Sequence, residues 1–156
     1  MSIVFENPVQ ELTYHKVADY LKTSTLFKDA FTGVSDQPSF ELTYGSAKIQ
    51  VAVLAWEVHP WEINDLAIVR ASSCVTQGSQ VNAALMQYLL SENSRMRFGS
   101  FQLGDDQTVL FAHSVLGGEH MDLLELQTCI LSVVTIADTY DDWIIAQFGG
   151  QPSRYS

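Results

Sequence analysis

The chain contains few basic side chains, few cysteines and only four prolines. Eight Lys and Arg residues stand against 18 Asp and Glu residues, which gives a formal net charge of −10. Binding to phosphate groups needs clustered positive charge, so this balance argues against a nucleic-acid partner and against an anionic membrane surface. The only basic concentration is the pair Arg95 and Arg97, and two charges are too few for such a surface.

The two cysteines, Cys74 and Cys129, each lie inside an apolar segment, and the sequence has no CxxC or comparable zinc-binding spacing. This pattern is typical of small buried side chains in a reducing compartment. The N-terminal residues lack the basic flank and apolar run of a signal peptide. No apolar stretch is expected to approach the roughly 20 residues of a membrane span. We therefore expect a cytoplasmic protein without a membrane segment.

Motifs that support catalysis are also missing: the sequence has no GxSxG, no P-loop and no GxGxxG. Ser114 follows His113, but neighbouring residues of a strand point to opposite faces and cannot act as nucleophile and base. His113, Glu119 and His120 lack the helical spacing of a metal site. The sequence thus predicts no enzyme, no catalytic residue, no bound metal and no cofactor.

Hydrophobic residues make up 47% of the chain and charged residues 17%, proportions typical of a folded globule. We expect one domain over residues 1–150 and a flexible tail over 151–156. Asn7 and Pro8 predict a helix start, and Ser79 is the predicted cap of a second helix. Periodicity predicts helices over 8–22, 80–92 and 122–148 and strands over 40–44, 47–56, 63–75, 98–103 and 108–115, with a loop over 32–38. The element order α-β-β-β-α-β-β-α indicates an α+β fold.

The last predicted helix carries an unusually broad apolar stripe, which includes Leu124, Leu131 and Trp143 besides the residues of one face. Such a stripe predicts that the helix is covered on more than one side.

Several segments in the second half of the chain resemble one known family. Leu89-Leu90-Ser91-Glu92-Asn93 with Arg97-Phe98-Gly99-Ser100-Phe101 is similar to the middle of YbjN-type domains, as are His113 to Gly117 and the closing stretch from Ala137 to Gly150. The resemblance implies the fold of type III secretion chaperones, a twisted antiparallel sheet packed against helices. It further implies a non-enzymatic, often dimeric protein that binds extended client segments along apolar patches.

Three residues are candidates for a partner-binding site. Trp56 and Trp61 flank a connection that is expected at the surface, and aromatic side chains dominate interaction hot spots; alternatively, each Trp closes one end of the core. Arg70 is the single charge in an apolar strand and is suited to a partner's carboxylate or a small anion. The alternative for Arg70 is an outward position or a structural ion pair.

Two functions fit these observations. The first is a protein-interaction domain, chaperone-like or a regulatory adaptor, that presents apolar surface to a polypeptide and forms a homodimer. Its acidity favours basic clients. The second is a small-ligand sensor with a pocket between the sheet and the last helix. An exposed apolar patch supports the first function, and a closed pocket with converging polar groups supports the second.

Overall fold

The structure is a computed structural model that describes residues 2–61 and 65–152. Its helices are α1 (Pro8–Thr23), α2 (Ala83–Asn93) and α3 (Leu123–Phe148). Its strands are β1 (Phe31–Val34), β2 (Ser39–Tyr44), β3 (Ala47–Trp56), β4 (Leu66–Gln77), β5 (Ser100–Leu103), β6 (Val109–Leu116) and β7 (Gln151–Pro152). The predicted α+β fold and its order of long elements are confirmed, and two short strands, β1 and β7, are added to them.

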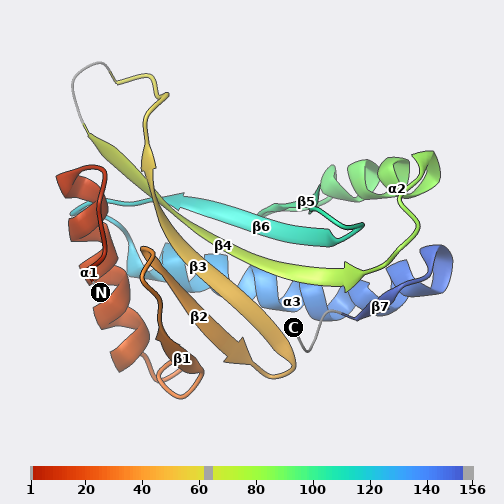
Figure 1. Cartoon of the computed structure of the whole chain (residues 1–156), viewed down its shortest axis with the longest axis horizontal. Coiled ribbons are helices and arrows are strands. Elements are labelled where there is room, and N and C mark those ends of the chain that lie inside the picture. Colours follow the sequence, from red (N-terminus) through yellow and green to blue (C-terminus); the bar gives the residue numbers. More distant parts are fainter. Residues whose placement is uncertain (1, 62–64, 153–156) are drawn as a thin grey trace.

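The strands form one antiparallel sheet in the order β1-β2-β3-β4-β6-β5, and β7 pairs with the end of β4. The β3–β4 ladder runs from Trp56↔Leu66 to Gln50↔Ser72, although both strands continue beyond Gln50 and Ser72. Figure 1 shows β3 and β4 side by side near their hairpin and diverging toward the other end. The sheet is therefore strongly twisted, with a split between its two halves.

Two helices cover one face of this sheet, which we call the helix face. Along β3 and β4, every second side chain is buried on this side. These side chains pack with residues of α1, such as Tyr14, Val17 and Leu21, and of α3, such as Leu126 and Ile130. In Figure 1, α3 runs across the back of the sheet, α1 lies along one side, and α2 lies near the end of β4. The core is thus a two-layer sandwich of helices on a sheet.

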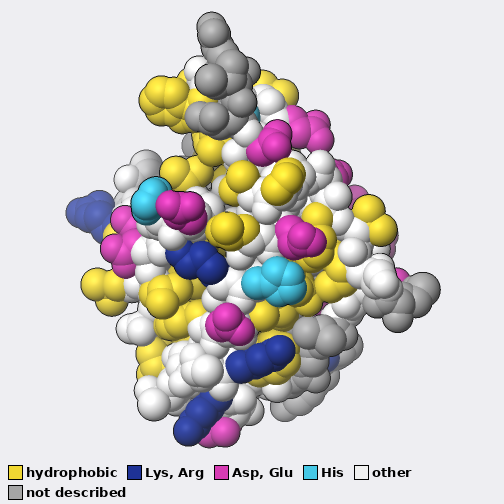
Figure 2. Space-filling view, turned by 90° about the vertical axis from the view of Figure 1, so that its left-hand side faces the viewer, with side chains coloured by type: hydrophobic (Ala, Val, Ile, Leu, Met, Phe, Trp, Pro, Cys, Tyr) yellow, Lys and Arg dark blue, Asp and Glu magenta, His cyan; other side chains and the backbone are white. Residues whose placement is uncertain are grey.

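The other side of the sheet, which we call the open face, carries the alternate side chains. Lys48, Gln50 and Leu54 on β3 are exposed there. Figure 2 shows the α1 side of the molecule, where charged side chains of both signs and histidines are interspersed among hydrophobic ones. Surface charge on this side is therefore mixed.

The prediction that α3 is covered on more than one side is wrong for much of its length. Its buried residues face the sheet, whereas Leu124 and Trp143 are exposed, 67% and 52% respectively. The breadth of the stripe reflects an outer face of apolar and uncharged residues that the described elements leave open to solvent.

The predicted loop over 32–38 begins with a strand instead. Phe31 is paired with Leu42 of β2, and its ring packs against Phe40 at 5.8 Å between centroids. Burial of the Phe31 ring against Phe40 stabilises the strand. This gain in free energy exceeds the preference of the neighbouring residues for a turn.

The second helix begins at Ala83, three residues after its predicted start. Its cap is Asn82, whose side chain accepts a hydrogen bond from the Leu85 amide at 2.9 Å, and the prediction of Ser79 as cap was wrong. Ser79 is buried instead, and its hydroxyl donates to the Gly149 carbonyl at 3.0 Å. That bond ties the end of β4 to the end of α3.

The chain after α3 also differs from the expectation of a loose tail. Gln151 and Pro152 pair with Gln77 and Thr76 of β4, so the first two residues of the predicted 151–156 tail are part of the sheet. The remaining four residues lie outside the described part of the chain, as do residues 62–64 at the start of the strand predicted over 63–75.

Candidate functional site on the open face of the sheet

Apolar side chains form a row across the open face near the β3–β4 hairpin. Leu54 of β3 pairs with Ile68 of β4, and Ile68 pairs with Leu116 of β6. Leu116 is 54% exposed, and Leu54 is 39% exposed. The next pair toward the hairpin is Trp56↔Leu66, and both side chains are half-buried. These five residues, which we call the open-face row, present apolar surface across three adjacent strands.

Arg70 lies on the same face, two residues along β4 from Ile68. Its guanidinium group donates a hydrogen bond of 2.6 Å to the Gln102 side-chain carbonyl on β5. The outward position considered for Arg70 is therefore correct, but its partner is a neutral amide rather than a carboxylate. Arg70 is paired with Ala52 and Ser114, which both have small side chains. Neither of these paired side chains therefore rises beside the guanidinium group.

The two tryptophans occupy different positions. Trp56 ends β3 and packs against His59, with ring centroids 5.6 Å apart. Trp61 lies in the connection, is 61% exposed, and donates its backbone N–H to His59 Nδ1 at 3.1 Å. Neither Trp belongs to the buried core. The structure therefore brings Trp56 and Arg70 onto one face, roughly 13 Å apart along the strands at about 3.3 Å per residue.

Sequence reasoning missed Leu54, Ile68 and Leu116 as site residues. The signal is present in the strand patterns, because β3 and β4 carry apolar residues on both faces at the hairpin end, whereas a strand with one solvated face normally alternates with polar residues. Composition alone does not show that three such residues fall into register.

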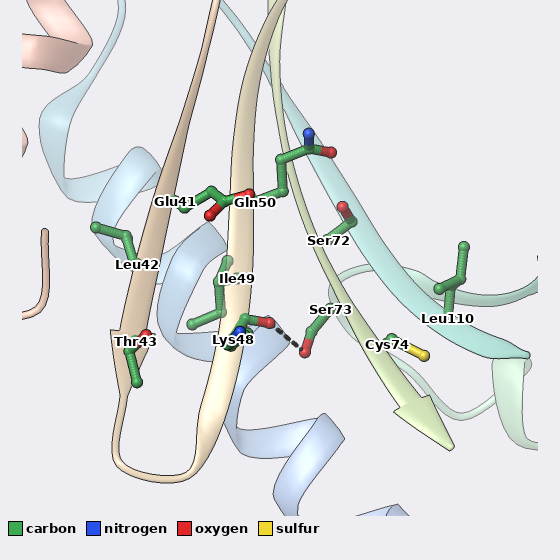
Figure 3. Close-up of a pocket in the computed structure, with 10 residues that line it drawn as sticks. All are labelled: Glu41, Leu42, Thr43, Lys48, Ile49, Gln50, Ser72, Ser73, Cys74 and Leu110. Carbon is green, nitrogen blue, oxygen red and sulfur yellow. Dashed lines mark hydrogen bonds between the residues drawn. The ribbon is translucent and has the colours of Figure 1, made fainter. Parts of the chain in front are cut away.

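A shallow cavity of about 590 Å³ lies where β3 and β4 diverge. Figure 3 shows Glu41 and Gln50 on one side of it and Ser72 and Cys74 on the other. The Ser73 hydroxyl donates to the Lys48 carbonyl at 2.8 Å and bridges the split there. A second hollow of about 430 Å³ shares Gln50 and reaches Leu54 and Arg70. Together they form a polar trough that leads to the open-face row.

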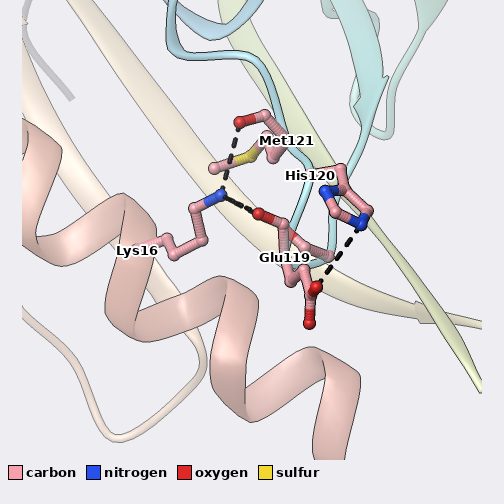
Figure 4. A network of polar contacts seen from close by, with 5 residues as sticks. Lys16, Glu119, His120 and Met121 are labelled. Atoms are coloured by element: carbon pink, nitrogen blue, oxygen red, sulfur yellow. Dashed lines mark hydrogen bonds and ion pairs between the residues drawn. The ribbon is translucent and has the colours of Figure 1, made fainter.

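Contacts from α1 fix the chain just after Leu116. The Lys16 ammonium group donates to the backbone carbonyls of Glu119 at 2.7 Å and Met121 at 3.3 Å (Figure 4). Thr13 accepts a hydrogen bond from the Gly118 amide at 2.8 Å. His120 and Glu119 form an exposed pair at 3.3 Å. The end of β6 that carries Leu116 is thus held by the helix layer.

The residues that could support catalysis do not converge. Cys129 is buried, which raises its thiol pKa to about 11, and its sulfur donates to the His113 backbone carbonyl rather than to an imidazole. Burial lowers the pKa of His113. Ser114 points to the open face, away from His113. Within residues 2–61 and 65–152, no group of three or more His, Cys, Asp or Glu side chains is arranged to hold a metal ion.

One helix in the described part of the chain, α3, is long and apolar enough to cross a membrane by length and composition alone. The expectation that no stretch approaches this length was therefore wrong. Core helices of soluble proteins have the same length and composition, and α3 contributes eight buried residues to this fold.

Comparison with known proteins gives one clear relation. A search of curated proteins gave no significant match. The family model described as "T3SS (YopN, CesT) and YbjN peptide-binding chaperone 1" matches residues 26–155, well over half of the chain. The match extends the resemblance seen in the second half of the sequence to every strand of the described sheet, from β1 to β7. The chain therefore belongs to this family of peptide-binding chaperone domains.

Proposed function

We propose that this domain binds extended segments of other polypeptides on the open-face row and acts, without catalysis, as a chaperone-like or regulatory adaptor. The observation that carries the proposal is the register of Leu54, Ile68 and Leu116 across three strands. Monomeric soluble proteins seldom leave a contiguous patch of apolar side chains open to water without an interaction to cover it. Membership of a peptide-binding family supports a polypeptide as the covering partner.

The net charge of the whole chain favours a client with basic residues. The chain has a net charge of −10. Among the residues that line the trough, Glu41 and Glu6 are acidic, and Lys48 and Arg70 are basic. The trough itself is thus balanced in charge. The attraction of positively charged segments comes from the net charge of the chain and acts over about a Debye length, roughly 8 to 10 Å at physiological ionic strength. Arg70 can hold a carboxylate of the same client through paired N–H bonds.

A small-ligand sensor is not favoured. A cavity between the sheet and α3 in the described part of the chain, lined by Ala137, Asp138 and Asp141 among others, measures about 10 Å³. That is close to the space of a single water molecule. Arg70, the residue suited to a small anion, lies on the open face, on the opposite side of the sheet from this cavity.

Peptide binding at the open-face row can be tested by fluorescence anisotropy. The probe is a labelled 14-residue peptide with an apolar centre and lysines at both ends. We expect the double variant Ile68→Thr and Leu116→Thr to bind it at least tenfold more weakly, because threonine keeps the strand preference and removes apolar area.

Leu103→Thr is the matched control. Leu103 is 44% exposed on β5, away from the row, and its replacement should leave the affinity unchanged. Equal loss in the control and the double variant, or no loss in either, would show that the row is not the binding surface.

We also propose that the chain is cytoplasmic and forms a homodimer. The exposed side chains of Trp61 in the β3–β4 connection and Leu90 on α2 are candidate association surfaces. Light scattering after size exclusion should give a dimer mass for the parent protein. A folded monomer for Trp61→Asp would assign the connection to the interface, and one for Leu90→Asp would assign α2. A monomeric parent would contradict the dimer.

A further inference from the structure

A second surface lies on the opposite side of the molecule from the open-face row, along the outer face of α3. Helix positions Thr128, Leu131, Ser132, Thr135 and Ile136 follow steps of three and four, so they share one stripe about 12 Å long at 1.5 Å per residue. The segment Arg95 to Phe98, between α2 and β5, lies beside this stripe and completes a groove of about 460 Å³. We call it the α3 groove.

The floor of the α3 groove is unusual for a surface helix. From Leu126 to Ala137 the helix contains no charged side chain, although the outer face of a solvated helix normally carries charges. Leu131 and Ile136 are only half-buried, and Phe98 at the rim is 48% exposed. Met96 packs its side chain toward the core. The groove therefore offers a continuous uncharged strip with apolar side chains at its floor and rim.

The rim of the groove carries positive charge in an otherwise acidic protein. Arg95 and Arg97 are two of the eight basic residues of the chain, and both line the groove. The Arg95 side chain is 79% exposed while it pairs with Glu92 at 3.4 Å. Arg97 donates to the Arg95 backbone carbonyl at 3.3 Å. Two guanidinium groups that flank an uncharged strip form a surface complementary to an apolar segment with carboxylates at one end.

We propose that the α3 groove is a second polypeptide-binding surface, selective for a short apolar segment that carries acidic residues next to its apolar part. This partner is opposite in charge to the client proposed for the open-face row, so the two surfaces select different segments. The groove can hold a segment of a client, or of a regulatory protein, while the open-face row is occupied.

Two labelled 14-residue peptides with the same apolar centre, one flanked by glutamates and one by lysines, distinguish the two surfaces. Fluorescence anisotropy on the full chain should show that Arg97→Glu weakens binding of the glutamate peptide at least tenfold. Thr135→Arg adds a third cation at the floor and should strengthen it several-fold. The Arg97→Glu effect should shrink at high salt, because exposed charges are screened.

Two controls keep this test separate from that of the open-face row. Lys28→Glu makes the same charge change at an exposed position outside the groove and should leave the affinity for the glutamate peptide unchanged. The double variant Ile68→Thr and Leu116→Thr should weaken the lysine peptide and leave the glutamate peptide unaffected. Failure on the open face would then leave the groove result intact.

Three results would overturn the proposal. Equal affinity of the double variant Ile68→Thr and Leu116→Thr, in which the open-face row is disabled, for both peptides would remove the charge selectivity of the groove. An unchanged affinity for the glutamate peptide in both Arg97→Glu and Thr135→Arg would place its binding elsewhere. A change of oligomeric mass in either groove variant would show that a second copy of the chain, not a foreign segment, covers the groove.

Discussion

The two faces of the sheet are built from the same strands but differ in composition and consequence. Along β6, Phe111 is fully buried beneath α3, whereas Leu116, five residues later, is 54% exposed on the open face. The helix face is closed by α1 and α3, so its apolar side chains stabilise the fold. The open face keeps apolar side chains that no element among the described residues covers. A partner that binds there can therefore bury them.

Period-2 alternation within a strand therefore separates the side chains that stabilise the fold from those that we propose bind a partner. A substitution on the helix face changes packing against two helices, and a substitution on the open face changes a surface that water already reaches. The four predictions below test this separation, from the largest expected effect to the smallest.

Phe111→Ala should be the most destabilising of these changes. The ring packs edge-on against Phe101 at 5.0 Å and is fully buried, so its loss leaves a cavity and should lower the free energy of unfolding by about 3–5 kcal/mol. Leu116→Ala, in the same strand, should change it by less than about 0.5 kcal/mol. Urea denaturation followed by circular dichroism measures both. A similar loss in the two variants would contradict the division between faces.

The two cysteines form a natural pair for the same comparison. Cys129 lies on the helix side and its thiol pKa is about 11, so about one thousandth of it is thiolate at pH 8. Cys74 lies on the open face at the rim of the cavity in Figure 3. Iodoacetamide at pH 8 should therefore label Cys74 at least about 100-fold faster than Cys129, as read by peptide mass mapping. Equal rates in the native protein would mean that α3 does not protect its buried face, and equal rates in 8 M urea serve as the control.

The sequence was sufficient to predict the elements whose period is clear and whose ends carry strong signals. The Asn7–Pro8 start of α1 and the strand predicted over 47–56 are both confirmed. Asn82 was missed as a cap because Ser79 is an equally good capping residue. Only the tertiary contact of Ser79 with Gly149 decides between the two.

The candidate site was less accessible from the sequence. Trp56 and Arg70 were identified as unusual residues, and the structure places both on the open face. The open-face row depends on strand register, and the α3 groove depends on which side of α3 the sheet covers. Both are long-range relations that local periodicity does not encode. The broad stripe of α3 was noticed, but burial on several sides and an unpartnered outer face give the same pattern.

Lys16→Met should have a smaller effect than either large change, because it removes one anchor of the helix layer and retains the side-chain length. The ammonium group donates to the backbone carbonyls of Glu119 and Met121, in the segment between β6 and α3 (Figure 4). Hydrogen bonds from a charged donor contribute about 1.5–3 kcal/mol when desolvated, and the partial exposure of Lys16 places the expected loss near 1–2 kcal/mol. Thermal and urea unfolding measure it. Lys28→Met, at an exposed position, is the control and should change stability by less than about 0.5 kcal/mol.

The smallest expected effect is a pH dependence of the free energy of unfolding that comes from His113. This residue lies on the helix face of β6, where side chains after Phe111 are only half-buried. Its imidazole is half-buried and meets the partly exposed ring of Phe98 edge-on at 5.5 Å. Desolvation lowers the pKa of His113 below its ordinary value of 6.5, so the unfolded chain binds a proton at this site more readily than the folded one. The contribution of the neutral His113 to the free energy of unfolding is fully present above pH 6.5. It should fall as the pH decreases from 6.5 through the lower folded-state pKa.

Urea midpoints of the parent protein and of His113→Asn, measured between pH 8 and pH 5, isolate this contribution. The parent should lose stability relative to the variant below pH 6.5, and the difference should be constant above it. His120→Asn, at a highly exposed position, should follow the parent at every pH. Parallel curves for the parent and His113→Asn would mean that Phe98 and α3 leave the imidazole as well solvated as in the unfolded chain. The helix face would then end at Phe111 rather than extend along the whole of β6.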